Sequence, residues 1–243
     1  MAQNIYDDPQ FYEGYSQLRR SVDGLAGAPE WPALRALLPD LRGLRVVDLG
    51  CGYGWFCRWA QEQGAARILG LDVSEKMLAR AKELTSAAGI TYQRTDLESF
   101  ELPADSFDIA YSSLTLHYIA DIAIFFAKVQ RALRPGGCFV FSTEHPIYMA
   151  PSRPAWATGS DGHQTWPVDG YLAEGPRTTD WFAPGVVKHH RTIGTTLNLL
   201  IRQGFTITHV EEWGPTDDQI SANPQWTKER ERPMFLLVAA QRA

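Results

Sequence analysis

Three glycines occupy alternate positions after a short apolar run, in the order Asp48-Leu49-Gly50-Cys51-Gly52-Tyr53-Gly54. Glycine reaches backbone angles that are closed to other residues and lets a ligand approach the chain closely. We therefore expect a ligand to lie against this turn. Asp72 follows 22 residues after Gly50, at the end of the next apolar run, where a carboxylate can accept both hydroxyls of a ribose. Together these features predict a nucleoside-containing cofactor.

A glycine turn followed by an acid also occurs in nicotinamide and flavin enzymes, in which the turn binds a pyrophosphate at a helix N-terminus. Two details differ here. The spacing is GxGxG rather than GxGxxG, and Asp48 lies inside the strand, two residues before Gly50. A carboxylate at that place would repel a pyrophosphate but would attract an ammonium group. The pattern therefore favours a cofactor that carries an amino acid.

Three histidines are candidates for a general base, because imidazole titrates near neutral pH. His117 follows the fourth expected strand, His145 follows the fifth, and His189 is expected at the start of a C-terminal helix. Ligands bind beyond the carboxyl ends of parallel strands, which is where these residues fall. Each histidine could instead make a structural hydrogen bond. No Cys/His set has the spacing of a metal site, so we expect no metal.

The candidate residues lie in a part of the chain where segments with a strand pattern alternate with segments with a helix pattern. This alternation is typical of a parallel sheet whose strands are connected by helices. The expected strands are 44–50, 66–74, 90–97, 107–114 and 137–144, and the expected helices are 55–63, 75–87, a helix capped by Asp121 that runs to 133, and 190–204. Strands at 205–213 and 233–241 have no helical pattern between them, so they predict an antiparallel pair at the sheet edge.

Two further segments flank this core. Residues 1–40 predict a helical cap that carries aromatic side chains on one face. Residues 145–189 contain six prolines, five glycines and three tryptophans, which predicts a lid over the substrate with sparse regular structure. We expect both segments to belong to one domain that spans residues 1–243.

The order of the motifs resembles that of the class I S-adenosylmethionine-dependent methyltransferases. VVDLGCGYG is similar to the family's first motif, GLDVS to the second, TDLESF to the third, FDIAYSSLTLHY to the fourth, and LRPGG to the turn before strand five. The resemblance covers residues 44–142 and the C-terminal strands. It implies an α/β fold with a Rossmann-like, doubly wound sheet of seven strands, an antiparallel C-terminal strand, and an aromatic-rich lid inserted after strand five.

The resemblance also implies S-adenosylmethionine as the cofactor and suggests its contacts position by position. Gly50 and Gly52, with Asp48 beside them, are expected along the methionine part, and Asp72 is expected at the ribose. The remaining expected contacts are Val73, Met77, Asp96 and Leu97 at the adenine, Ser112 with Leu114 and His117 beneath the methyl group, and Tyr15 or Arg19 at the methionine carboxylate.

The expected reaction is therefore transfer of the methyl group of S-adenosylmethionine to an oxygen or nitrogen of a small-molecule acceptor by in-line displacement. Holding the acceptor close and aligned can supply at most about 7–11 kcal/mol of the barrier. Three alternatives stay open: a methyltransferase that acts on RNA or protein, a nicotinamide-dependent oxidoreductase, and a binding module that senses the cofactor without turnover.

The net charge and the hydropathy of the chain indicate which classes of partner to expect. The net charge of −5 at pH 7 disfavours nucleic acid, whose binding depends on cationic contacts. No segment approaches the roughly 18 apolar residues of a membrane span, and the first residues lack the pattern of a secretory signal. We therefore expect a cytoplasmic protein without a membrane partner, as a monomer or homodimer.

Overall fold

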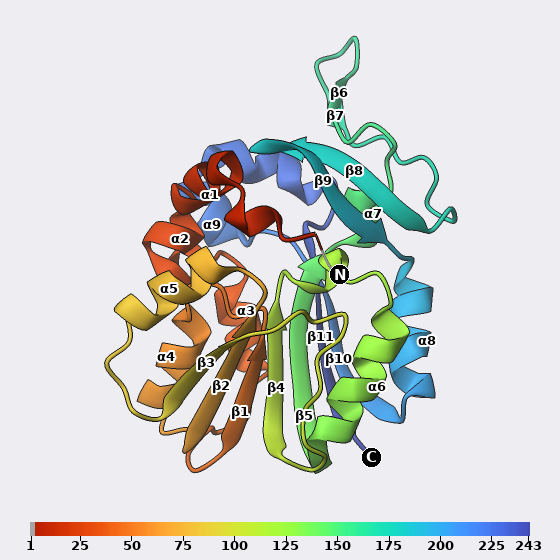
Figure 1. Cartoon of the computed structure of the whole chain (residues 1–243). Coiled ribbons are helices and arrows are strands. Elements are labelled where there is room, and N and C mark those ends of the chain that lie inside the picture. The colour runs from red at the N-terminus through yellow and green to blue at the C-terminus, as the bar shows by residue number, and fades with distance from the viewer. Residues whose placement is uncertain (1–2) are drawn as a thin grey trace.

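The computed structural model describes residues 3–243, and across these residues its largest element is a mixed sheet of seven strands (Figure 1). The strand order is β10-β11-β5-β4-β1-β2-β3. These strands are β1 (Arg45–Leu49), β2 (Arg67–Asp72), β3 (Ile90–Arg94), β4 (Phe107–Ser113), β5 (Leu133–Glu144), β10 (Phe205–Trp213) and β11 (Phe235–Arg242). Strands β1 to β5 pair in parallel, and β11 is antiparallel to both β5 and β10. The expected doubly wound sheet with an antiparallel C-terminal strand is confirmed.

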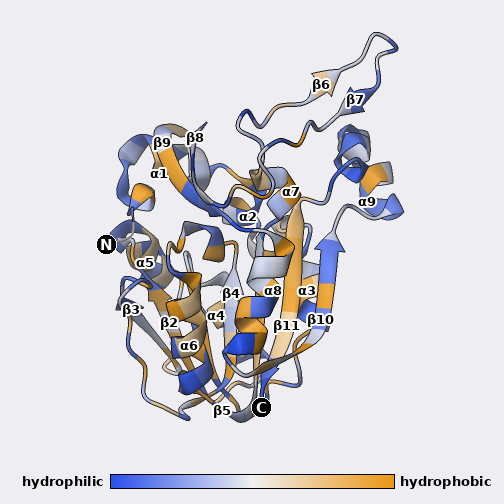
Figure 2. Ribbon diagram, turned by 90° about the vertical axis from the view of Figure 1, so that its right-hand side faces the viewer, coloured by the Kyte–Doolittle hydropathy of each residue, from blue (hydrophilic) through white to orange (hydrophobic). Residues whose placement is uncertain are grey.

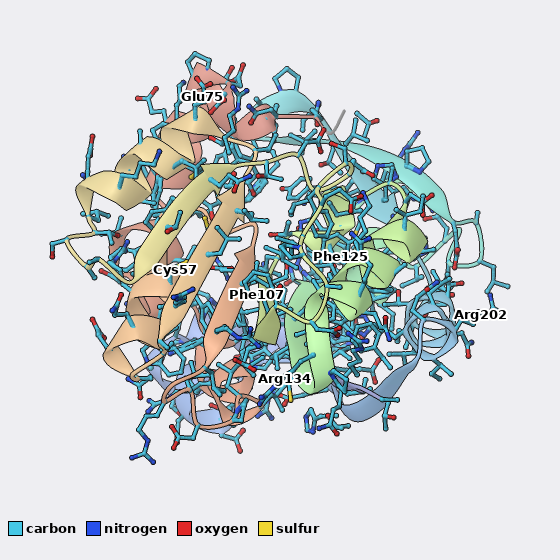
Figure 3. The ribbon with its side chains drawn as sticks, turned by 60° about the horizontal axis from the view of Figure 1, so that its bottom comes forward. Cys57, Glu75, Phe107, Phe125, Arg134 and Arg202 are labelled. Atoms are coloured by element: carbon cyan, nitrogen blue, oxygen red, sulfur yellow. The ribbon has the colours of Figure 1, made fainter. Side chains whose placement is uncertain are left out.

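Helices cover both faces of the sheet. One layer contains α6 (Ile122–Ala132) and α8 (Ile193–Arg202), and the other contains α3 (Trp31–Ala36), α4 (Trp55–Glu62) and α5 (Glu75–Glu83). Figure 3 labels Phe125 on α6 and Arg202 on α8 in the first layer, and Cys57 on α4 and Glu75 on α5 in the second. The other helices are α1 (Pro9–Ser16), α2 (Arg19–Val22), α7 (Pro146–Met149) and α9 (Asp217–Ala222), with 3₁₀ turns η1 (Ile5–Asp7), η2 (Gly24–Gly27), η3 (Leu116–Tyr118) and η4 (Pro224–Arg230).

Local sequence explains the two layers. Successive side chains of a strand point to opposite faces of a sheet, and in β11 Leu236 and Val238 pack against the α6 layer while Leu237 packs against the α4 layer. Helix α6 begins after Asp121, whose carboxylate accepts a hydrogen bond from the Ile124 amide at 3.0 Å, as the sequence predicts. The core is therefore a sheet buried on both faces.

Three expectations about elements need correction. The lid has more regular structure than expected, because it contains the hairpin of β8 (Gly175–Trp181) and β9 (Ala183–His190) and the short hairpin of β6 (Ala157–Thr158) and β7 (Gln164–Thr165). His189 lies in β9 rather than at the start of α8, which Thr192 caps. The segment between β10 and β11 is not free of helix, because it forms α9 and η4. Figure 2 shows the β6–β7 hairpin standing away from the body.

The N-terminal segment from Gln3 onward packs on the β8–β9 hairpin, above the sheet (Figure 1). The Gln3 side chain donates to Gly185 O at 2.8 Å and accepts from the Val187 amide at 2.9 Å. Gly14 of α1 lies against the hairpin tip, because a Cβ there would come within 2.5 Å of the Phe182 ring. Phe11 is fully buried in the same cluster. The cap and the hairpin therefore form one roof.

Among residues 3–243 we find no helix with both the length and the apolar character that crossing a bilayer requires.

Candidate active site

A cavity of about 550 Å³ opens at the carboxyl ends of the parallel strands and extends beneath the roof. Its volume is in the usual range for small-molecule sites. Residues at the ends of β1, β2, β4 and β5 line its floor, and residues of the cap, α7 and the β8–β9 hairpin line the rest. This is the position at which sheets of this topology bind ligands.

The glycine turn and Asp72 lie side by side in this cavity. The Gly52 amide donates to Asp72 Oδ2 at 2.8 Å, and the Ser74 amide donates to Oδ1 at 2.9 Å. Gly50 and Gly52 have φ of +88° and +50°, angles that side chains disfavour. A Cβ on Gly50 would come within 2.1 Å of the Thr115 side chain. Glycine is therefore favoured at Gly50 by both the backbone angle and the Thr115 side chain, and at Gly52 by the backbone angle.

Asp48 is buried at the end of β1, where it lines the cavity and accepts a hydrogen bond from the Cys57 thiol at 3.3 Å. Burial raises the pKa of Asp48 to about 7, because it disfavours the charged form. A cationic group in the cavity would stabilise the ionised carboxylate. Contact between Asp48 and an ammonium group stays a prediction from the sequence.

Of the residues expected at the adenine, some line the cavity and one does not. Val73, Met77 and Leu97 line the cavity, whereas Asp96 does not and its carboxylate accepts from the Glu98 amide at 3.0 Å. Ser112 is also outside the lining.

Ser112 is fully buried, and its hydroxyl donates to Leu49 O at 2.7 Å. It therefore supports β1 from below. Its neighbour Leu114 does line the cavity, with φ of +52°, a strained angle for leucine of the kind found at functional sites.

The cap contributes Tyr15 and Arg20 to the cavity but not Arg19. Arg19 is 80% exposed and faces Asp23, whereas Arg20 is held at 3.1 Å from both carboxylate oxygens of buried Glu30. The cationic side chain of the cap that reaches the cavity is therefore one position later than expected.

The described residues fit a nucleoside with an amino acid end. No atom lies within 4 Å of where a Cβ of Gly52 would be, so the turn leaves open space on its cavity side. The Asp72 carboxylate lies at one side of this space and Asp48 at another, while Val73, Met77 and Leu97 supply an apolar wall. An anionic pyrophosphate would meet both carboxylates, which like-charge repulsion disfavours.

The opposite end of the cavity contains a buried ion pair. Lys188 of β9 donates to Glu144 Oε1 of β5 at 2.5 Å, and the two side chains are 8% and 13% exposed. The Lys188 ammonium also lies 5.0 Å from the centre of the Trp181 ring. Glu144 Oε2 is buried and has no hydrogen-bond partner among the described residues. We did not predict the Glu144–Lys188 pair, because no spacing in the sequence connects residues 44 positions apart.

Burial raises the pKa of Glu144, but attraction to His117 and Lys188 outweighs it, so the pKa lies below its usual range. Burial also lowers the pKa of His117 to about 4, which leaves this ring neutral near pH 7. A neutral ring cannot attract the carboxylate as a charge. We therefore attribute the ionisation of Glu144 at neutral pH to Lys188.

His117 lines the cavity, yet its hydrogen bonds favour a donor role there. Its Nδ1 accepts from the Glu144 amide at 3.4 Å, and an amide can only donate. The proton of the neutral ring is then assigned to Nε2, which leaves no free lone pair on the ring. Proton removal by His117 stays a prediction that this geometry disfavours.

His145 and His189 do not line the cavity. His145 is fully buried at the start of α7, where Nδ1 accepts from the Ile147 amide at 3.1 Å and Nε2 lies 2.9 Å from Glu212 Oε1. His189 borders a separate hollow of about 20 Å³. The structure therefore brings only one of the three candidate bases to the site. Within residues 3–243 we find no group of three or more His, Cys, Asp or Glu side chains arranged to hold a metal.

The chain is similar to known methyltransferases over most of its length. The model of a family described as a methyltransferase domain matches residues 47–141. A crystal structure of an S-adenosylmethionine-dependent methyltransferase from Mesorhizobium loti is 67% identical, covers 90% of this chain and 100% of that one, and superposes with a TM-score of 0.87. An uncharacterized protein of Haemophilus influenzae is 32% identical over 98% of this chain and 97% of its own length.

A malonyl-[acyl-carrier protein] O-methyltransferase of Enterobacter lignolyticus is 33% identical over 146 residues, which are 60% of this chain. The match spans about half of that relative, 53% of its length. These similarities agree with the geometry of the cavity and decide against a nicotinamide-dependent oxidoreductase. The chain belongs to the class I S-adenosylmethionine-dependent methyltransferases and is an enzyme of that type, with S-adenosylmethionine as its cofactor.

Proposed function

We propose that this enzyme methylates an oxygen or nitrogen of a small molecule. The observation that carries the proposal is a single cavity that extends from Asp72 and the glycine turn at one end to Trp181 and the Glu144–Lys188 pair at the other. A roof built from the cap and the β8–β9 hairpin covers it. Such a covered cavity suits a compact acceptor better than a polymer.

Two further observations support this. The net charge of −5 disfavours nucleic acid as the acceptor. The relatives named malonyl-[acyl-carrier protein] O-methyltransferase have, by that name, a malonyl group as acceptor and oxygen as the methylated atom. Their similarity to this chain favours a small acceptor group and, of the two elements, oxygen.

We assign the cofactor end to residues that line the cavity. Asp72 would bind the ribose, Asp48 the ammonium group, and Gly50 and Gly52 the methionine chain. The apolar wall of Val73, Met77 and Leu97 would hold the adenine, and Tyr15 and Arg20 would close over the carboxylate. Asp96 and Ser112 would act indirectly, by holding the backbone on which these residues lie.

When bound, S-adenosylmethionine would supply a methyl group to the acceptor. The methyl carbon would form a bond to the acceptor atom, and the electron pair of the broken carbon–sulfur bond would stay on sulfur. The chain's own task is to align the acceptor with that carbon and to exclude water. Tyr6, Tyr118 and Trp181 enclose the acceptor end with aromatic surface. His117 offers a donor and Glu144 offers an acceptor beside it.

The test is turnover to S-adenosylhomocysteine with three separated fractions of a cell extract: metabolites below about 1 kDa, protein, and RNA. We expect product only with the metabolite fraction, and less product with the Asp72→Ala variant when S-adenosylmethionine is limiting. Turnover that depends on the RNA or protein fraction would support the polymer alternative instead. Cofactor binding without turnover in all three fractions would support the sensing module.

We also propose that residues 1–40 and 145–189 are the cap and lid of one domain, because both contribute to the roof of the same cavity.

A further inference from the structure

We propose that the Glu144–Lys188 pair selects a neutral hydroxyl compound as the methyl acceptor, with Glu144 Oε2 accepting the hydrogen bond of the reacting hydroxyl. This inference rests on the proposed function and names its substrate class. It is carried by Glu144, which lines the cavity and whose Oε2 atom is buried and lacks a hydrogen-bond partner among the described residues.

A buried carboxylate oxygen without a hydrogen bond is costly, so the site favours a ligand that donates there. Lys188 satisfies only Oε1, at 2.5 Å. The pair is held from two elements that meet at the top of the sheet, β5 below and β9 above (Figure 1). The position of Oε2 is thus fixed by the fold rather than by a flexible surface chain.

The charges at this end of the cavity sum to zero. Glu144 and Lys188 neutralise each other, Arg20 is paired with Glu30, and His117 is uncharged near neutral pH. Arg177 and Asp180 of β8 also line the cavity, and their opposite charges cancel in the sum. The Arg177 guanidinium donates to Ala150 O and Ala173 O, and Asp180 accepts from the Gly185 amide. Beside the neutral sulfur of S-adenosylhomocysteine, a charged acceptor head group would enter a buried site without a counter-charge of its own, which desolvation strongly disfavours. A neutral head group meets no such penalty.

Among neutral groups, a hydroxyl matches the proton chemistry. As the hydroxyl oxygen forms its bond to the methyl carbon it becomes strongly acidic, and its proton passes to Glu144 Oε2 while the electron pair of the O–H bond stays on oxygen. A carboxylate held ionised by Lys188 is basic enough for this step. An alkylammonium with a pKa of about 10.4 would not give up its proton to such a carboxylate.

The aromatic lining defines the rest of the acceptor. Trp181 lies beneath the Lys188 ammonium, and Tyr118 and Tyr148 also face the cavity. Rings of this kind favour a flat or apolar body. We therefore choose probes that share one phenyl ring and differ only in the head group: benzyl alcohol, benzoate and benzylamine.

The experiment measures binding of each probe to the protein saturated with S-adenosylhomocysteine, by ligand-observed NMR titration at pH 7.5. For the wild type we expect benzyl alcohol to bind about tenfold more tightly than benzoate or benzylamine, the range of one hydrogen bond to a charged group. Equal or tighter binding of benzoate or benzylamine would overturn the proposal, and so would the absence of binding by all three probes.

Two variants should change which of the three probes binds most tightly. Glu144→Gln leaves Lys188 unpaired, so benzoate should become the preferred probe. Lys188→Met leaves Glu144 unpaired, so benzylamine should be preferred. Glu101→Gln, which alters a glutamate with 64% of its side chain exposed, is the matched control and should keep the wild-type order. An unchanged order in both cavity variants would exclude the pair as the selecting element.

Thermal unfolding and S-adenosylhomocysteine affinity show whether each variant is folded. If either variant fails to fold, the wild-type order of the three probes alone decides the proposal. Failure of the proposed function looks different, because it would appear as no S-adenosylhomocysteine binding or as turnover confined to RNA or protein fractions.

Discussion

The backbone amide of Gly52 donates a 2.8 Å hydrogen bond to Oδ2 of Asp72, which joins the turn after β1 to the end of β2. Asp72→Ala removes this acceptor together with the proposed ribose contact. We expect S-adenosylhomocysteine affinity to fall at least about tenfold, because a hydrogen bond to a charged group contributes about 1.5–3 kcal/mol. Isothermal titration calorimetry measures the change.

Asp40→Ala is the control for this variant, since Asp40 lies on the surface and pairs with Arg42. It should bind as the wild type does. Unchanged affinity of Asp72→Ala would place the ribose elsewhere.

Comparing Gly52→Ala with Gly43→Ala distinguishes two effects of an added methyl group: strain in the backbone and loss of space in the cavity. Gly52 and Gly43 both have positive φ, +50° and +76°, and at neither would a Cβ have a neighbour within 4 Å. Both alanine variants should lose about 1 kcal/mol of unfolding free energy. Only Gly52→Ala should also weaken S-adenosylhomocysteine binding, by about tenfold or more, because its methyl group enters the space proposed for the ligand.

Urea unfolding and calorimetry on the two variants provide the comparison. If Gly43→Ala weakened binding equally, the effect would come from general destabilisation rather than from the cavity.

Asp48 should make cofactor affinity depend on pH. Its pKa of about 7 means that half of the ligand-free protein carries a proton there at neutral pH, and the ammonium group of the cofactor would favour its release. Binding should then strengthen by about eightfold from pH 6 to pH 7.5, as linkage predicts for loss of one proton.

The proton release itself can be measured by calorimetry in two buffers of different ionisation enthalpy. Asp48→Asn should bind more weakly and show no release. A proton release that persists in this variant would assign the pKa to another group.

His117 should make the ligand-free protein less stable in acid. Its pKa is lowered from 6.5 to about 4 by burial, so between these values the unfolded chain takes up a proton that the folded chain does not. The free energy of unfolding should therefore decrease as pH falls from about 6.5 to 4, with a contribution of up to about 1.4 kcal/mol per pH unit.

The raised pKa of Asp48 acts in the opposite direction between its ordinary value and about 7, so only the difference between proteins isolates the histidine. Urea unfolding at pH 7.5 and pH 5 should show a smaller loss for His117→Asn than for the wild type. An identical loss in both would mean that His117 titrates normally.

Features of the site that depend on residues close together in the sequence could be predicted from the sequence alone. The turn at Gly50 and Gly52 needs glycine for its backbone angles, and Asp72 ends the next strand of the same βαβ unit, so both could be predicted from local spacing. The parallel pairing of the central strands followed from the alternation of strand and helix signals along the chain.

Arg19 shows where such reasoning fails. Helix α2 has only four residues, which is too short for periodicity to decide which of two adjacent arginines faces inward. The structure turns Arg20 inward because Glu30, ten residues away, binds it with both carboxylate oxygens.

His145 lies outside the cavity for a different reason. His145 follows β5, as a ligand-facing residue would, but Glu212 on the edge strand β10 holds its ring outside the cavity. Lys188 lines the cavity because the β8–β9 hairpin folds back over the sheet. The periodicity of the sequence does not predict this tertiary contact. The site's acceptor end is made of tertiary contacts, whereas its cofactor end follows the order of the strands.

The roof that joins Gln3 to Gly185 and Val187 has a practical consequence for anyone who clones this enzyme. A shortened version chosen to match the recognisable methyltransferase region, residues 47–141, would keep much of the central sheet and the glycine turn. It would leave out both ends of the chain, from which Tyr15, Arg20 and Phe235 reach the binding space. Such a fragment would present an open trough in place of a chamber.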